Sequence, residues 1–195
     1  KYFWDSIDVN AEYQVNISVE EGEREIRIAK GNKKGKSDFN LTLCAHLDHP
    51  GLANDNLSGV FAVLEVFDRL PSHLNFGVEV LIVPEIIGSQ FYLNDNRAPN
   101  LGIFVESVGS NGEFEVQSTF DGRSVLDKVI KARLEQKHDG CLVPFKKNYA
   151  NDEIVFEAHS CPMVSVTRGI FEHYHPSDDN FEGLNIANID DTIEF

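Results

Sequence analysis

The chain has 195 residues, of which 42% are hydrophobic, and this length and composition suit one substantial core and a single domain. Its 32 acidic and 17 basic residues give a formal charge of -15, which argues against nucleic-acid or acidic-membrane partners, since both attract clustered Lys and Arg. No run approaches the roughly 18 uncharged apolar residues of a membrane span. We therefore expect a globular protein with neither kind of partner.

The N-terminus and the cysteines are informative about the cellular location of the protein. It shows no secretory signal. Because it begins with Lys1 rather than Met, we expect a fragment of a longer polypeptide. Cys44, Cys141 and Cys161 are odd in number and widely spaced, without a CxxC pair, which indicates neither a disulfide framework nor a cysteine metal site. These features favour a cytoplasmic location.

The N-terminal third has the patterns of β-strands. Residues 13–20 and 24–30 alternate apolar and polar side chains around a Glu-Glu-Gly sequence, which predicts a hairpin. The basic cluster at 30–38 is interpreted as a solvated loop. Denser apolar runs at 39–46, and later at 78–84 and 101–107, predict central strands covered on both faces.

Helical patterns alternate with these strands. Val60, Val63, Leu64 and Phe67 recur at helical spacing within 56–70, where Asn56 or Ser58 is expected to cap the start. Four further elements are expected: helices at 88–96 and 123–137, and strands at 141–145 and 161–167. The alternation predicts an α/β fold with a mixed, mainly parallel central sheet.

Potential ligands follow each central strand. They are His46, Asp48, His49 and Asp55 after the first strand, Glu85 after the second and Glu106 after the third. A polar C-terminal loop adds His173, His175, Asp178 and Asp179. Taken singly, each is typical of a solvated loop, but the carboxyl ends of parallel strands gather at one edge of a sheet. Imidazole and carboxylate together suit zinc, so the joint pattern predicts a zinc site.

Five segments, in order along nearly the whole chain, resemble the zinc-dependent aminopeptidase fold family, which includes leucyl aminopeptidases, glutamate carboxypeptidases and glutaminyl cyclases. They are LCAHLDHP, GLANDNLSGV, PEIIGSQFYL, VESVG and HYHPSDDN. Within this family, the chain most resembles bacterial aminopeptidase-like domain proteins of poorly defined function. The resemblance implies a three-layer α/β/α zinc exopeptidase-like fold with one or two zinc ions.

The resemblance also assigns roles to individual residues. It implies a first ion bound by His46, Asp55 and Glu106. Asp55 would bridge to a second ion completed by His175, and Asp48 would orient the site. Asp152, in the segment YANDEIVF, would be a supporting residue rather than a ligand.

One departure concerns the paired glutamates of the family, of which the first is a general base and the second a ligand. Here Glu85 is followed by Ile86, which cannot ligate. If Glu85 is the base, the second ion has lost a ligand, whereas if Glu85 is the ligand, Pro84 stands at the position of the base. The related subfamily also commonly has Cys-His-Pro where this chain has Asp-His-Pro, so His49 is an alternative to His46.

The predicted reaction is hydrolysis of a terminal amide bond in a small peptide or acylated amine. Zinc lowers the pKa of a water molecule to about 7, and Glu85 would accept its proton. Ser58 is interpreted as a capping or packing residue, and Cys44 as part of the core. Two alternatives are another amide chemistry on the same scaffold, such as deacylation or cyclisation, and a non-catalytic domain that retains a metal.

Overall fold

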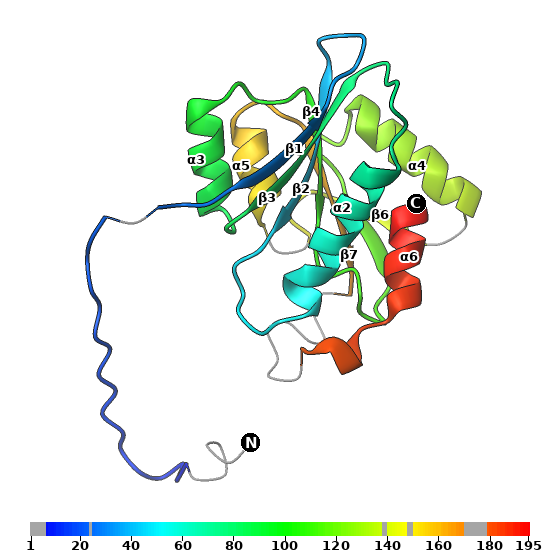
Figure 1. Cartoon of the computed structure of the whole chain (residues 1–195). Coiled ribbons are helices and arrows are strands. Elements are labelled where there is room, and N and C mark those ends of the chain that lie inside the picture. Colours follow the sequence, from blue (N-terminus) through cyan, green and yellow to red (C-terminus); the bar gives the residue numbers. More distant parts are fainter. Residues whose placement is uncertain (1–6, 24, 138–139, 148–149, 170–178) are drawn as a thin grey trace.

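The structure, a computed structural model, describes residues 7–23, 25–137, 140–147, 150–169 and 179–195 (Figure 1). Seven strands form one sheet: β1 (Ala29–Lys33), β2 (Asn40–His46), β3 (Gly77–Val83), β4 (Leu101–Val105), β5 (Phe114–Gln117), β6 (Cys141–Val143) and β7 (Met163–Arg168). The helices are α2 (Gly59–Arg69), α3 (Ile87–Asp95), α4 (Val125–Lys137), α5 (Asp152–Ala158) and α6 (Ile186–Glu194). Short helical turns at Asn54–Ser58 and Phe181–Gly183 precede α2 and α6.

The sheet is mixed and mainly parallel, as predicted. Its strand order is β1-β3-β2-β4-β7-β5-β6. The central strands β3, β2, β4 and β7 run parallel to one another, while β1 is antiparallel to β3 and β5 is antiparallel to β7. The carboxyl ends of β2, β3 and β4 therefore lie along one edge, which is where the sequence places its polar residues.

Helices cover both faces of the sheet, so the predicted three-layer fold is confirmed (Figure 1). One core joins α2, α4 and α6 to one face, and a second core joins α3 and α5 to the other. Neighbouring strand residues alternate between them: Leu43 and Ala45 belong to the first core, and Cys44 to the second. Every residue of β3 is buried, which explains its dense apolar pattern; the one charged residue, Glu79, accepts a hydrogen bond from the Thr42 hydroxyl and pairs with Lys30.

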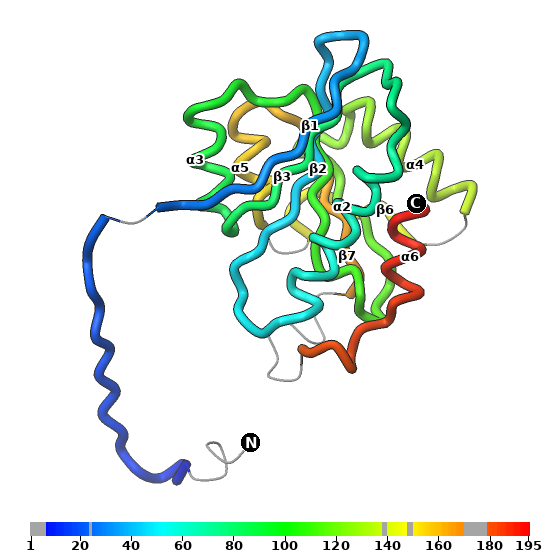
Figure 2. The backbone as a smooth tube through the Cα atoms, in the orientation of Figure 1, coloured from blue at the N-terminus to red at the C-terminus, as the bar shows by residue number. Residues whose placement is uncertain are grey.

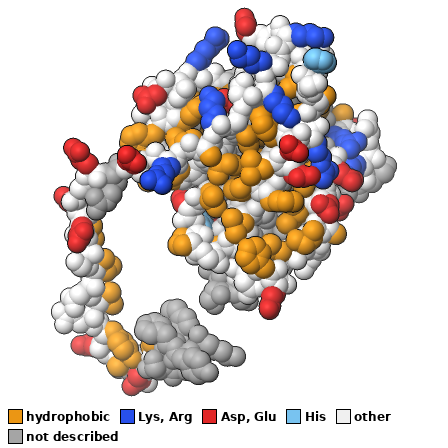
Figure 3. Space-filling model, in the orientation of Figure 1, with side chains coloured by type: hydrophobic (Ala, Val, Ile, Leu, Met, Phe, Trp, Pro, Cys, Tyr) orange, Lys and Arg blue, Asp and Glu red, His pale blue; other side chains and the backbone are white. Residues whose placement is uncertain are grey.

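The two longest predicted helices form, with local differences. Leu126, Ile130 and Leu134 of α4 are buried as expected. On α2, Val63 is buried, but Leu64 is 45% exposed, so the predicted apolar stripe is wider than the buried face. Figure 3 shows apolar side chains gathered over this side of the molecule.

The predicted N-terminal hairpin is wrong. Residues 13–20 form no strand, and their backbone runs apart from the sheet (Figure 2). Their apolar side chains are exposed, from Tyr13 at 58% to Ile17 at 82%. The strand that does form, β1, lies further along the chain and pairs with β3. It includes Lys30 and Lys33, so the basic cluster is only partly a loop.

Two further expectations concern cysteines and membranes. Cys44 lies in the core, and all three cysteines are free thiols, in agreement with the sequence. Within the described ranges, no helix combines the length and apolar content needed to cross a membrane.

Candidate metal centre

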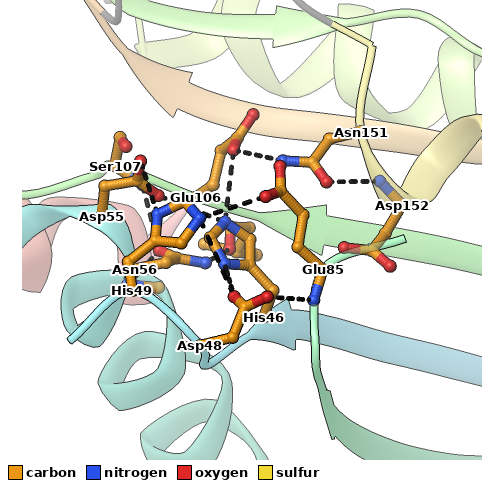
Figure 4. A network of polar contacts seen from close by, with 12 residues as sticks. His46, Asp48, His49, Asp55, Asn56, Glu85, Glu106, Ser107, Asn151 and Asp152 are labelled. Atoms are coloured by element: carbon orange, nitrogen blue, oxygen red, sulfur yellow. Dashed lines mark hydrogen bonds and ion pairs between the residues drawn. The ribbon is translucent and has the colours of Figure 1, made fainter. Parts of the chain in front are cut away.

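Of the predicted ligands, the four that the structure describes lie close together at the carboxyl edge of the sheet: His46, His49, Asp55 and Glu106 (Figure 4). His46 is the last residue of β2, and Glu106 directly follows β4. Asp55 comes from the turn between β2 and α2. His46 Nε2 lies 3.2 Å from Asp55 Oδ1 and 3.7 Å from Glu106 Oε2. One ligand atom from each residue lies within 4.8 Å of the other two, which is a spacing that suits a shared cation.

This cluster is buried. His46 is 0% exposed, Glu106 3% and Asp55 4%. The ring of Phe104, itself 0% exposed, stacks near the His46 imidazole with centroids 6.0 Å apart and an interplanar angle of 23°. Buried carboxylates are costly unless paired, so their convergence indicates a built site rather than a solvated surface.

The electrostatics of the cluster favours a positive charge among its members. Burial by itself lowers the pKa of His46, but Asp55 and Glu106 outweigh burial and raise that pKa to about 11. Burial raises the pKa of Glu106, and His46 opposes this rise. The same donor set, one imidazole nitrogen and two carboxylates, suits a divalent ion such as zinc.

The turn that carries Asp55 is tied to the end of β4 by polar side chains. Asn56 donates through Nδ2 to Val105 O (2.9 Å) and accepts through Oδ1 from Ser107 N (3.1 Å). The same Oδ1 accepts from Gly59 N at 3.0 Å, so Asn56 also bonds the start of α2, as predicted. Ser58 packs rather than caps, because its hydroxyl donates to Asn54 O and accepts from Val108 N. These bonds connect the turn that carries Asp55 to the end of β4, which Glu106 follows.

Asp48 and His49 flank the cluster. Asp48 Oδ1 lies 3.2 Å from His46 Nδ1, so it contacts the ring nitrogen opposite the one that faces Asp55. His49 Nδ1 lies 3.3 Å from Asp55 Oδ2, and its Nε2 lies 3.1 Å from Glu85 Oε2. The two oxygens of Asp55 thus face two different histidines. Both loop histidines belong to the arrangement, with His46 in the interior and His49 toward the rim.

Glu85 lies in a strained turn. Ile86 has φ 56° and ψ -54°, and Ile87 N donates to Glu85 O at 2.5 Å, the pattern of a positive-φ γ-turn. Acidic side chains hold the turn: Asp48 Oδ2 accepts from Glu85 N (2.9 Å), and Asp152 Oδ1 accepts from Ile86 N (3.0 Å). Strained backbone persists where its surroundings determine it, often at functional sites.

Asp152 lies beside the Glu85 turn, and the supporting role that the resemblance implies for it stays a prediction. It is 0% exposed, and the Ser89 hydroxyl also donates to its Oδ1. Burial raises the pKa of Asp152 to about 7, although its bonds to Ser89 and Ile86 and the nearby His46 oppose this. Asp152 therefore contacts the Glu85 turn rather than the ligand cluster.

Asn151 and Glu153 were not predicted from the sequence. Asn151 donates through Nδ2 to Glu106 Oε2 (3.0 Å), and its Oδ1 accepts from Asp152 N at the start of α5. Glu153, 0% exposed, accepts from Asn151 N and from Gln117 Nε2, and burial together with the neighbouring Glu106 raises its pKa to about 8. The only available signal was an Asn followed by two acids before an apolar run, which is typical of a helix start.

The C-terminal candidates are only partly described. His173, His175 and Asp178 lie outside the described residues. Asp179 is described, and its carboxylate accepts from the backbone of the turn that carries Asp55.

Residues 18–195 match a family described as a domain of unknown function (DUF4910). The chain belongs to this family. The DUF4910 chain is also 26% identical, over 196 residues, to a putative polysaccharide biosynthesis protein with aminopeptidase-like domain from Clostridium acetobutylicum. That alignment covers 96% of this chain and 45% of the relative, so the chain spans less than half the length of the curated protein.

Solved structures confirm the predicted resemblance to the aminopeptidase-like fold. A putative peptidase from C. acetobutylicum superposes with a TM-score of 0.78 at 24% identity, covering 86% of this chain and 42% of that one. BSAP, a zinc aminopeptidase from Bacillus subtilis, gives 0.72 at 19% identity, covering 86% and 47%. A glutaminyl cyclase from Porphyromonas gingivalis gives 0.70 at 17% identity, covering 87% and 74%. At these identities, the likeness establishes the fold of this DUF4910 chain and leaves its chemistry to the site.

Proposed function

We propose that this chain is the catalytic domain of a zinc-dependent hydrolase that cleaves a terminal amide bond, as an aminopeptidase does. The observation that carries the proposal is the convergence of His46, Asp55 and Glu106 at the carboxyl edge of the sheet, with their ligand atoms within 4.8 Å of one another. The fold shared with zinc aminopeptidases is independent support.

The first ion is assigned to His46, Asp55 and Glu106. His46 is preferred to His49 for this ion because its Nε2 faces both carboxylates. When bound, zinc supplies a Lewis acid that lowers the pKa of water to about 7 and polarises a substrate carbonyl. Asp48, beside His46 Nδ1, would fix the imidazole so that Nε2 points at the ligand set.

Glu85 is assigned the role of general base. Its carboxylate oxygen Oε2, which now lies beside His49, would accept a proton from the attacking water and return it to the leaving nitrogen. The strained turn fixes the backbone at Glu85, since Asp48 and Asp152 bind successive peptide N–H groups. Fixed placement of a base relative to the reacting carbonyl accelerates hydrolysis.

A second ion has fewer protein ligands here than in a site with paired glutamates. Ile86 supplies none, whereas His49 Nδ1 faces the outer oxygen of Asp55 at 3.3 Å. We assign His49, and His175 on the basis of the family resemblance, to any second ion that shares Asp55. The proposed substrates are small peptides or acylated amines, and the proposed setting is the cytoplasm.

Cyclisation of an N-terminal glutamine is the second candidate function. The observation that favours it is Ile86 in place of a second glutamate, which leaves one glutamate, Glu85, where a site with paired glutamates has two. Glutaminyl cyclases with this fold are among the similar structures. A non-catalytic domain that retains one metal is the remaining alternative.

The test combines zinc counting with turnover. Purified wild-type protein and Glu85→Gln are assayed on aminoacyl-p-nitroanilides, N-acyl amines and glutaminyl peptides. We expect stoichiometric zinc in both proteins and, because the amide cannot accept the proton, a rate at least about 100-fold lower in Glu85→Gln. Zinc without turnover on any substrate would refute the hydrolase, and turnover on glutaminyl peptides alone would support the cyclase.

A further inference from the structure

The Asp179 carboxylate accepts three consecutive backbone N–H groups from the turn that carries Asp55. Asp179 Oδ1 accepts from Ala53 N at 3.1 Å and from Asn54 N at 2.6 Å, and Oδ2 accepts from Asp55 N at 3.0 Å. The bonds join residues 124 to 126 positions apart in the chain. Hydrogen bonds to an ionised carboxylate are among the strongest in proteins.

These bonds act on the backbone of a candidate ligand. Asp55 faces His46 through one oxygen and His49 through the other, so a small rotation of its backbone would move both contacts. Asn56 fixes the following residue to the end of β4. The backbone of Asp55 is therefore held on its N-terminal side by Asp179 and on its C-terminal side by Asn56.

We propose that Asp179 is a positioning residue that sets the orientation of Asp55 for metal binding. The inference rests on the proposed zinc function and adds to it a residue outside the ligand set. Asp179 contacts only backbone N–H groups in these bonds, so it acts through Asp55 rather than on the metal or substrate. Outer residues that orient ligands typically change metal affinity about 10- to 100-fold when they are replaced.

The discriminating variant is Asp179→Asn. The amide has the same shape, but it offers one acceptor oxygen and places an N–H₂ group where the second carboxylate oxygen stood. It cannot accept from all three backbone groups in the same arrangement. The matched control is Asp190→Asn on α6, which makes the same change in charge at an exposed residue.

The experiment measures zinc affinity by competition with a chromogenic chelator, using the full chain after metal removal. We expect Asp179→Asn to bind zinc about 10- to 100-fold more weakly than wild type, and Asp190→Asn to match wild type. The visible spectrum of the cobalt-substituted protein should change in Asp179→Asn alone, because it reports ligand geometry. Thermal unfolding of the metal-free proteins measures any purely structural effect separately.

Each outcome decides the inference. Equal zinc affinity and cobalt spectra in wild type and Asp179→Asn would overturn it and leave the hydrolase proposal standing. A variant that loses stability without a change in either would also overturn it, since Asp179 would then be structural. A wild type that binds no zinc would refute the proposed function itself. Hydrogen exchange at residues 53–55 would still report, in that case, whether Asp179 holds the turn.

Discussion

Ile86 is the clearest case of backbone strain at the candidate site, and Ile86→Gly tests it. Its φ of 56° and ψ of -54° suit glycine better than a β-branched residue. Such a conformation costs about 1–3 kcal/mol in a non-glycine residue. Against this gain, the greater freedom of glycine in the unfolded chain lowers the free energy of unfolding by about 0.5–1 kcal/mol. Ile86 is 45% exposed. Removing this side chain therefore loses about half of the roughly 1.5–3 kcal/mol by which a fully buried apolar side chain stabilises a fold. The gains and losses nearly cancel.

Ile87→Gly is the matched control, because Ile87 is 58% exposed and begins α3 without a positive φ. Ile87→Gly loses the buried part of the side chain and gains the freedom of glycine in the unfolded chain, but it relieves no backbone strain. We therefore expect Ile86→Gly to be more stable than Ile87→Gly by about 2 kcal/mol. This difference corresponds to about 4–8 °C in Tm for a chain of this size. Chemical denaturation of both variants gives the comparison, and equal losses of stability would refute the strained turn.

Further predictions concern stability and the packing behind the site. Asp127 accepts from Ser124 and Thr119 at the start of α4, and although burial raises its pKa, these bonds lower it below the ordinary 3.8. Because its pKa is lower in the folded protein than in the unfolded chain, ionised Asp127 stabilises the fold above pH 3.8, and this stabilisation is lost as the pH falls further. We therefore expect Asp127→Asn to lower the free energy of unfolding by about 1–2 kcal/mol at pH 7 and by progressively less below pH 4. Chemical denaturation of both proteins at pH 7 and below pH 4 measures the difference. Phe104→Ala should cost about 3–5 kcal/mol and weaken zinc binding, because the ring is buried beside His46; unaltered zinc affinity would show that the stacking does not support the ligand.

The sequence predicted the middle of the fold because its strands are covered on both faces. The apolar runs that end at His46 and before Glu85 are long and dense, and they became β2 and β3. Parallel pairing then placed their polar ends together. A residue at such a strand end has its position fixed by the strand, so its convergence with others follows from topology alone.

Other parts depended on partners that a sequence pattern cannot identify. Residues 13–20 alternate like a strand, but alternation forms a strand only where a neighbouring edge pairs with it. The short strand β5 and the seven-residue helix α5 were missed because few residues carry their pattern. The contacts of Asp179 and Asn151 join distant segments, so these contacts became visible only in three dimensions.

The most direct test is zinc content after reconstitution, measured by elemental analysis in wild type, His46→Ala, His49→Ala and His175→Ala. We expect stoichiometric zinc in wild type and its loss in His46→Ala, because His46 supplies the nitrogen that faces both buried carboxylates. His49→Ala and His175→Ala should retain the first ion. Full zinc retention in His46→Ala would contradict the assignment of His46, Asp55 and Glu106 as the metal centre.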